Sequence, residues 1–333
     1  MSDTVTLPLG DALSLCETAA TRLGASAELA RSIAEAAVRA EAEGQPAVGL
    51  AHYIDYLDSL RDGRIDGRAE PAITRPAPAL ILSDARGGAA HPGFDRAFDD
   101  LVATARNFGL ALFVQKNAYT CGALGQFAAR LAEAGLVGLA ATNGPALIAG
   151  SGGTKPVYCT NPLAFAAPVE DGPPLLIDQS SSATAFVNIR QAAREGRPIP
   201  EGWAVDAEGS PTTDPNEAMK GALLAFGGVR GANIALMVEV LAAGLSGANW
   251  SLDAHSISEG SENPGSGLFV LAIAPALLDP DFSRRLAAQL DRLSADYGVH
   301  IPGPAKARAR QAAERDGMTV SRPIYERIAG ASR

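Results

Sequence analysis

The stretch KNAYTCGALG, residues 116–125, combines four reactive side chains where an apolar, strand-like run changes to a helical pattern. Catalytic groups are common at such junctions. Lys116 is a candidate partner for a carboxylate or a phosphate, the alternative being a solvated lysine. Tyr119 without a partner is a slow acid, because the ordinary pKa of a tyrosine is about 10. The Thr120 hydroxyl can either bind a substrate or accept hydrogen bonds from the first N–H groups of a helix. We expect Cys121 to be a small packing residue, because no neighbouring histidine lowers the pKa of its thiol.

Polar residues also follow three other apolar runs. Asp178 ends LLID and precedes QSSSAT, so it is either a site carboxylate or the cap of a turn. Asn143 and Gly144 close the run VGLAATN, and the ends of strands are favoured places for ligands in α/β sheets. Thr160 and Asn161 stand in CTNP, as cofactor contacts or as a turn before proline.

The four histidines are scattered along the chain. His52 lies off the apolar stripe of its predicted helix, so it is a candidate acid or carboxylate ligand, against an ordinary surface histidine. His91, His255 and His300 are expected to be structural or exposed. Because the chain also lacks the CxxC and HExxH spacings, we predict no metal site.

Two glycine clusters differ in context. AGSGGTKP, residues 149–156, lies between apolar runs with no helix after it and is expected to be a loop. FGGVRG, residues 226–231, opens a long helical pattern, so free N–H groups near Gly228 and the side chain of Arg230 are candidates to bind a phosphate. Glycine at a helix start serves packing or turn geometry equally often.

The two ends of the chain read as helical. ELARSIAEAAVRAEAEG carries an apolar stripe, with Ser26 as a possible N-cap and Gly44 as the stop. A second amphipathic run follows, and SRRLAAQLDRLSADYG is periodic in leucine after about residue 280. From about residue 76, strand-length runs such as ALILSD, ALFVQK and GLFVLAI alternate with helical ones. We therefore predict an α/β core over residues 76–280, with a helical domain built from residues 1–75 and 281–333.

The composition narrows the classes of function. A chain of 333 residues with 47% hydrophobic content can bury a large core. The net charge of −9 and the absence of a basic run make nucleic acid a poor partner. No signal-like start or membrane-length apolar run is found, and three separated cysteines fit reduced thiols, so we expect a cytoplasmic protein without a membrane partner.

Six longer stretches are YIDYLDSLRDGRI, CGALGQFAARLAEAGLVGLAATNGP, GGTKPVYCTNPLAFAAP, IPEGWAVDAEGSPTTDP, FGGVRGANIALMVEVLAAGLSGA and IPGPAKARAR. In this order, within about residues 36–310, they resemble the malate/L-lactate dehydrogenase family, which includes ureidoglycolate and sulfolactate dehydrogenases and Δ1-piperideine-2-carboxylate reductases. The resemblance implies an NAD(P)H-dependent oxidoreductase with a non-Rossmann, sulfolactate-dehydrogenase-like α/β core, and a homodimer. It places Asp178 at the nicotinamide end of the cleft, and Thr160 and Asn161 beside the cofactor. It favours NADPH, with NADH left open.

The chain departs from the family pattern at its acid/base positions. The family's Gly-His-x-Ser-His-Gly is here GQPAVG, residues 44–49, and the arginine expected three residues later, to hold a substrate carboxylate, is His52. Thr120 stands where a second catalytic histidine is expected. The later Gly-Gly-His-Lys-Gly keeps only a positive charge, at Arg230.

A ketone reductase must protonate a developing alkoxide, usually from a positioned acid. An imine nitrogen is far more basic than a carbonyl oxygen, so it can be protonated before hydride arrives. We therefore predict reduction of Δ1-pyrroline-2-carboxylate to L-proline and of Δ1-piperideine-2-carboxylate to L-pipecolate. Two alternatives are a 2-oxo-acid or 2-hydroxy-acid dehydrogenase in which His52 transfers the proton, and a catalytically silent homologue that binds a nucleotide or metabolite.

Overall fold

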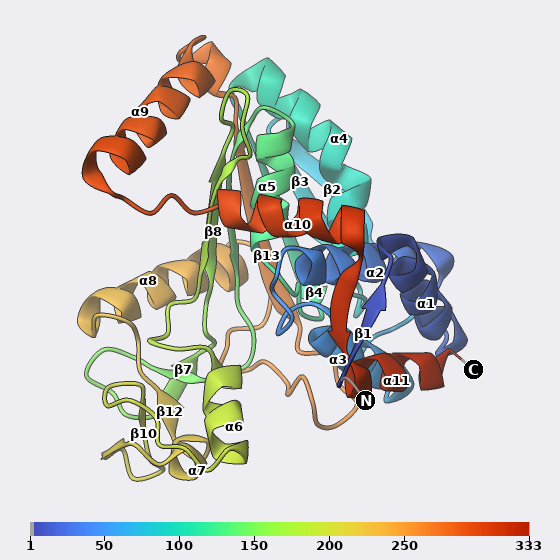
Figure 1. Ribbon diagram of the computed structural model, residues 1–333, viewed down its shortest axis with the longest axis vertical. Coiled ribbons are helices and arrows are strands. Elements are labelled where there is room, and N and C mark those ends of the chain that lie inside the picture. Colours follow the sequence, from blue (N-terminus) through green and yellow to red (C-terminus); the bar gives the residue numbers. More distant parts are fainter. Residues whose placement is uncertain (1–2, 333) are drawn as a thin grey trace.

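A seven-stranded mixed sheet forms the centre of the protein in a computed structural model that describes residues 3–332 (Figure 1). The strand order is β2-β3-β4-β13-β5-β8-β9. Within the described chain only β3 and β4 are parallel neighbours in this sheet. The order and directions differ from the doubly wound parallel sheet of a Rossmann fold, as expected. The strands are β2 (Ala72–Ala77), β3 (Leu80–Asp84), β4 (Leu110–Ala118), β5 (Val137–Thr142), β8 (Leu163–Ala167), β9 (Leu175–Gln179) and β13 (Ser266–Ile273).

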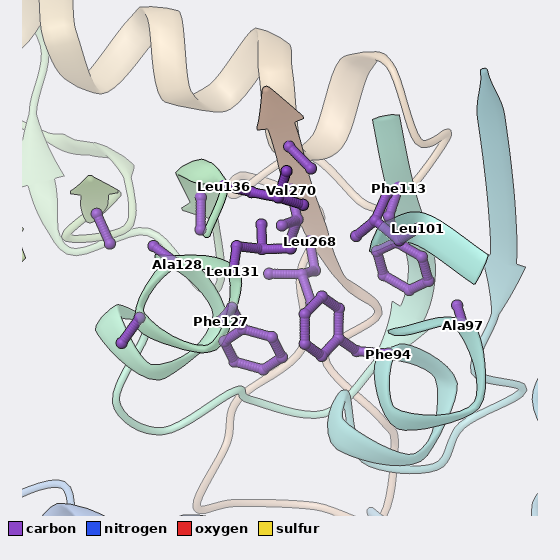
Figure 2. Packing of buried hydrophobic residues seen from close by; sticks show 14 of the residues in the cluster. Phe94, Ala97, Leu101, Phe113, Phe127, Ala128, Leu131, Leu136, Leu268 and Val270 are labelled. Carbon is purple, nitrogen blue, oxygen red and sulfur yellow. The ribbon is translucent and has the colours of Figure 1, made fainter. Parts of the chain in front are cut away.

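Helices α4 (His91–Phe108) and α5 (Gly125–Glu133) contact the sheet through a large apolar cluster. Figure 2 shows Phe94 of α4 and Phe127 of α5 meeting beside Leu268 of β13. Their rings lie 4.9 Å apart in an edge arrangement. At about 2 kcal/mol for each buried large apolar side chain, this cluster is a main source of stability. It therefore fixes α5, whose first residues carry part of the candidate site.

A further helix, α8 (Val229–Glu239), continues into a π-helical turn at Val240–Gly244 that contacts β13. Val238 packs with Phe269 of β13 in a separate small cluster. The approach is close, since a Cβ atom added at Gly267 would lie 2.1 Å from the carbonyl oxygen of Ala242. Glycine at 267 therefore lets the π-helical turn lie against the sheet.

A second, five-stranded sheet has the order β11-β10-β12-β6-β7. Its strands are short, and they pack with α6 (Phe186–Arg194) and α7 (Pro215–Ala218) around Ile148, Ile189 and Leu223. No separate sheet was predicted here, because strands of two or three residues give no alternating pattern. The loop between β6 and β7 was predicted. The strands are β6 (Ile148–Ala149), β7 (Pro156–Tyr158), β10 (Ala204–Val205), β11 (Pro211–Thr212) and β12 (Ala222–Leu223).

The two ends of the chain lie side by side (Figure 1), because β1 (Thr4–Leu7) pairs with β14 (Met318–Ser321). Around this pair pack α1 (Leu9–Arg22), α2 (Ala27–Ala42), α3 (Leu50–Arg61), α10 (Pro304–Asp316) and α11 (Arg322–Ala331). The predicted start of α2 is confirmed, since the Ser26 hydroxyl accepts a hydrogen bond from the N–H of Leu29 at 3.2 Å. Together these elements position α3, which carries His52.

Helix α9 (Phe282–Tyr297) follows a 3-10 turn at Pro275–Leu277 and extends away from the rest of the protein (Figure 1). The helix was predicted from its leucines, but none of its side chains, all within the described chain, is buried. The apolar cluster at the chain ends draws on α10, β14 and α11 instead. Among residues 3–332 there is also no helix long and apolar enough to cross a bilayer.

Candidate functional site

His52 and Thr120 come together at the junction of α3 with the loop after β4. The Nε2 atom of His52 lies 2.8 Å from Thr120 Oγ1, and its Nδ1 atom lies 2.8 Å from Asp55 Oδ2. The His52 side chain is 13% exposed, so it is less accessible than a free surface histidine. Its position off the apolar stripe of α3 turns the ring toward the loop, which covers it. Asp55 was not predicted as a partner, although its spacing of three residues on one helix face could have indicated it.

The same loop is anchored by two tyrosines. Tyr56 donates a hydrogen bond to the carbonyl oxygen of Thr120 at 3.2 Å, and its ring contacts His52 edge-on with centroids 4.9 Å apart. The hydroxyl of Tyr119 donates to the Ile257 carbonyl at 3.0 Å and accepts from Ser59 at 2.9 Å. Burial raises the pKa of Tyr119 to about 12. Tyr119 therefore holds the loop in place, with its proton already donated to a carbonyl.

Lys116 lies earlier, on β4, opposite Asp84 of β3. Its Nζ atom is 3.9 Å from Asp84 Oδ2. The next residue, Asn117, has a φ of 56° and donates to the other oxygen of Asp84. Lys116 thus belongs to an ion pair at the end of β3, and the structure records no hydrogen bond or ion pair between it and His52, Thr120 or Asp178 within the described residues.

Asp178, on β9, holds the far end of the loop. Its Oδ2 atom accepts a hydrogen bond from the N–H of Gly125 at 2.9 Å, at the start of α5. Burial raises the pKa of the Asp178 carboxyl, and the positive charge of Lys306 on α10 opposes that shift. A Cβ atom at Gly125 would lie 2.7 Å from the carboxylate, so glycine permits this contact. His52 and Asp178 therefore bind opposite ends of one loop, residues 119–125, which carries Thr120.

Thr160 and Asn161 lie in the loop before β8, next to the segment that follows Asp178. The N–H of Ser181 donates to the Thr160 carbonyl at 2.8 Å. The Asn161 side chain is buried, and its Nδ2 donates to the Ala235 carbonyl at 2.8 Å and to Glu239 at 2.7 Å. Its side chain thus ties this loop to α8, and the role of Thr160 as a cofactor contact stays a prediction.

Glu239 is a buried carboxylate that was not predicted from the sequence. It also accepts hydrogen bonds from the N–H and the hydroxyl of Ser251, at 2.6 and 2.8 Å. The only signal in the sequence was a single acid inside the apolar run ALMVEVLAAG. Because these donors satisfy it, Glu239 links the loop before β8 to the segment after the π-helical turn.

Asn143 and Gly144, after β5, lie against that segment. Asn143 donates to the Asn249 carbonyl at 2.8 Å and accepts from the N–H of Gly267 at 2.8 Å. A Cβ atom at Gly144 would lie 3.3 Å from the sulfur of Cys159. Both polar ends of the Asn143 amide are therefore used within the protein, and the ends of β5 and β13 are fastened together.

A cavity of about 460 Å³ lies at the start of α8, lined by residues 150–153, Ala183, Gly227 and Gly228 among others. Gly228 is the N-cap with a φ of 64°, and no side chain caps this end of α8 within the described residues. Arg230 is exposed in the first turn. Free N–H groups, glycine backbone and a nearby guanidinium fit an anion such as the pyrophosphate of a dinucleotide. Ala183 is five residues beyond Asp178, at most about 18 Å along the chain.

The other histidines are placed as structural or exposed residues. His91 is buried between aromatic rings, His255 is half-exposed beside Glu262 at 2.9 Å, and His300 is exposed. Cys121 is buried, and burial raises the pKa of its thiol to about 12, as expected of a packing residue. Residues 3–332 contain no cluster of three or more His, Cys, Asp or Glu that could hold a metal ion.

Comparison with known proteins identifies similar chains. The Δ1-pyrroline-2-carboxylate/Δ1-piperideine-2-carboxylate reductase of Pseudomonas putida is 35% identical over 324 residues, covering 96% of this chain and 95% of that protein. The (2R)-3-sulfolactate dehydrogenase (NADP(+)) of Chromohalobacter salexigens is 36% identical over 306 residues, covering 92% of each.

The similar solved structures also include an imino-acid reductase and a sulfolactate dehydrogenase. The Δ1-piperideine-2-carboxylate reductase of Pseudomonas syringae superposes with a TM-score of 0.94 at 32% identity, over 98% of this chain and all of that one. This confirms the predicted non-Rossmann fold, which the sulfolactate dehydrogenase of Methanocaldococcus jannaschii shares at a TM-score of 0.88. A family model described as malate/L-lactate dehydrogenase matches residues 8–329. The chain therefore belongs to the malate/L-lactate dehydrogenase family.

Proposed function

We propose that the protein is an NAD(P)H-dependent reductase of cyclic imino acids, converting Δ1-pyrroline-2-carboxylate to L-proline and Δ1-piperideine-2-carboxylate to L-pipecolate. The observation that carries the proposal is one loop that carries the Thr120 hydroxyl and is bound at its other end by the partly buried carboxylate of Asp178, in a chain that lacks both family histidines. Relatives named as reductases of one or both of these substrates, at 34–36% identity, support it.

The chemistry of the substrate fits these two groups. A protonated cyclic imine is a cation, and a carboxylate in a poorly solvated place stabilises it more strongly than water-exposed charge would. Asp178 supplies that charge, while the rigid loop of residues 119–125 presents the Thr120 hydroxyl. Bound NAD(P)H supplies the hydride. The residues around the reacting carbon then have to orient the ring and exclude water.

The cofactor site proposed here uses the cavity at the start of α8. Gly228 and Arg230 would hold the phosphates, and the loop around Thr160 would approach the nicotinamide end. The part of the site near the nicotinamide would be supported by Asn143, Gly144 and Asn161, through the contacts described above. We propose NADPH as the cofactor, supported by the NADP(+) dependence in the name of the Chromohalobacter salexigens relative.

The purified protein is expected to oxidise NADPH with the five-membered or the six-membered cyclic imine. It should be at least about 100-fold slower with pyruvate or oxaloacetate, because a carbonyl oxygen is far less basic than an imine nitrogen. The measurement is loss of nicotinamide absorbance with all four substrates side by side. A preparation that reduced the oxo acids but neither imine would contradict the proposal.

A 2-oxo-acid or 2-hydroxy-acid dehydrogenase is the second candidate. The observation that favours it is the sulfolactate dehydrogenase relative, which is as similar in sequence as the imine reductases. In that case His52 would supply the proton for the developing alkoxide, and His52→Gln should abolish oxo-acid reduction without weakening NADPH binding.

We also propose a homodimer in the cytoplasm. Large apolar side chains are exposed along α8 and the segment after it, more than a solitary monomer usually shows in one place. They are Val229, Leu236, Met237, Val240, Leu245, Trp250 and Leu252. Three unpaired cysteines fit a reducing compartment.

Met237→Glu is expected to weaken dimerisation by at least about tenfold, because it places a carboxylate in a desolvated contact. Met237 is 42% exposed in the single chain, and Met219, 39% exposed after α7, offers a matched control. Light scattering across a dilution series measures the dimerisation of the Met237→Glu and Met219→Glu variants. A wild-type monomer at every concentration would contradict the dimer, and equal weakening by Met219→Glu would contradict the assignment to α8.

A further inference from the structure

We propose that Asp55, His52 and Thr120 form a proton relay that ends at the substrate nitrogen. The proposal rests on the proposed function and adds to it: Thr120 is the catalytic residue that delivers the proton, and His52 and Asp55 are positioning residues that act through it. The relay would take the place of the acid that this chain lacks at residues 44–49 and at 120.

The hydrogen bonds define the direction of transfer. Asp55 Oδ2 is 2.8 Å from His52 Nδ1, so the carboxylate favours a proton on Nδ1. In the neutral ring Nε2 then accepts from the Thr120 hydroxyl, 2.8 Å away. When the ring is protonated, Nε2 donates to Thr120 Oγ1 instead, and the hydroxyl proton is free to point at a ligand. Because both nitrogens are engaged, neither is left to hold a substrate carboxylate.

The relay connects water to the interior. The Asp55 side chain is 50% exposed and that of His52 is 13% exposed, while Thr120 is half-buried. The outer end can therefore exchange protons with solvent, and the inner end lies on the loop whose other end is bound by Asp178. This order, from solvent to loop, is the one that a proton supply requires.

The surroundings hold the three groups in register. Tyr56 binds the Thr120 carbonyl, so α3 fixes both the side chain and the backbone of this residue. Gly122 has a φ of 61°, and a Cβ atom there would lie 3.8 Å from the Cδ2 atom of His52, so the loop turns directly beside the ring. The groups that face His52 are Asp55 and Tyr56 from α3, Thr120 from the loop and His91 from α4. A positive charge on His52 contributes to lowering the pKa of His91.

The step balances without a further reactant. Hydride from NADPH forms the new C–H bond at the imine carbon, and the C=N bond becomes C–N. His52 enters the step with both ring nitrogens protonated. The imine nitrogen takes the proton of the Thr120 hydroxyl, and Thr120 takes the Nε2 proton of His52. The ring is left neutral with its proton on Nδ1 beside Asp55, and solvent returns a proton to Nε2. One imine, one NADPH and one proton give one amino acid and one NADP+.

Thr120→Val tests the relay, since it replaces a hydroxyl with a methyl of similar size. At about pH 8.5, where the free imine is neutral, kcat/KM should fall about 100-fold, a common contribution of a general acid. At about pH 6, where more of the substrate arrives protonated, the loss should stay within about threefold. Thr120→Ser should restore most of the alkaline activity, and NADPH binding measured by fluorescence should be the same in both variants.

Asp55→Asn should show a weaker loss with the same dependence on pH, and Asp58→Asn is its matched control. Asp58 lies one turn further along α3, where it pairs with Arg61 and Arg327 and not with His52. An equal loss for Thr120→Val at both pH values would overturn the relay, because it would mean that the hydroxyl only positions the substrate. No loss at either pH would overturn it as well.

Two further results separate the relay from the proposed function. If the wild type reduced only 2-oxo acids, the proposed function would fail, yet the relay would still require Thr120→Val to lose that activity at both pH values; retained activity would overturn it. Nitrogen-15 NMR of His52 needs no turnover. Whenever the ring is neutral its single proton is expected on Nδ1, and a neutral ring with its single proton on Nε2 would overturn the relay.

Discussion

Asp178→Asn is expected to lower kcat/KM for the cyclic imine by about 100- to 1000-fold, the usual cost of removing one electrostatic contact from a transition state. Asparagine has nearly the same shape, and its side-chain oxygen can still accept the hydrogen bond from Gly125 that starts α5. The substitution therefore removes the charge that we propose stabilises the iminium and leaves the loop in place.

The same variant should be no less stable than the wild type. Burial raises the pKa of Asp178 above its ordinary value, with Lys306 as the opposing influence. A carboxyl with a raised pKa in the folded protein ionises more readily when unfolded, so its ionisation lowers the free energy of unfolding as the pH rises. Asparagine carries no such cost. Loss of activity with equal or greater stability is the pattern of a charge kept for function.

Steady-state kinetics and urea unfolding at about pH 7.5 check both parts of this expectation. The matched control is Asp171→Asn, an exposed carboxylate in the turn before β9 with a φ of 54°, a conformation that asparagine tolerates well. Asp171→Asn should change neither kcat/KM nor the free energy of unfolding. Full activity in Asp178→Asn would show that the side chain only caps α5.

Long elements with a strong apolar pattern could be predicted from the sequence. Helix α2 begins after Ser26, where its N-cap was expected, because the cap and the apolar stripe are local signals that agree. The strands β3, β4 and β13 were visible as apolar runs of the right length. The small sheet was not, because β10 and β12 have two residues each and owe their existence to pairing with distant segments.

The site could be predicted in its residue types but not in its contacts. His52 and Thr120 are 68 positions apart, and nothing local indicates that a loop will cover the histidine. Glu239 was missed for the opposite reason: its position in an apolar helix suggested packing, while its three donors come from residues 161 and 251. Tertiary hydrogen bonds of this kind leave a weak trace in a single sequence.

When the pH is lowered from about 7 to about 4, the free energy of unfolding is expected to fall in the wild type and in His91→Phe. The fall should be about 3 kcal/mol larger in the wild type. Burial lowers the pKa of His91 from 6.5 to about 4, with smaller effects from Asp95, Arg130 and His52. At about 1.4 kcal/mol for each pH unit, that difference corresponds to about 3 kcal/mol.

The sign follows from the lowered pKa. Below about pH 6.5 the unfolded chain binds a proton at His91 that the folded protein does not bind until about pH 4, so unfolding becomes more favourable as the pH falls. The ring stacks on Phe127 at 5.6 Å and meets Tyr56 edge-on, which phenylalanine can reproduce. Within the described residues neither ring nitrogen has a hydrogen-bond partner, so the replacement leaves no polar group unpaired.

Urea unfolding at several pH values between about 4 and about 7 measures the difference between the two proteins, and only that difference is assigned to His91, because carboxyl groups titrate in both. His300→Asn, which removes an exposed histidine, should follow the wild type. Parallel curves for wild type and His91→Phe would mean that His91 is already protonated, or hydrated, in the folded protein. The expected divergence would instead show that the folded protein keeps His91 neutral, packed between Tyr56 and Phe127, until the pH falls to about 4.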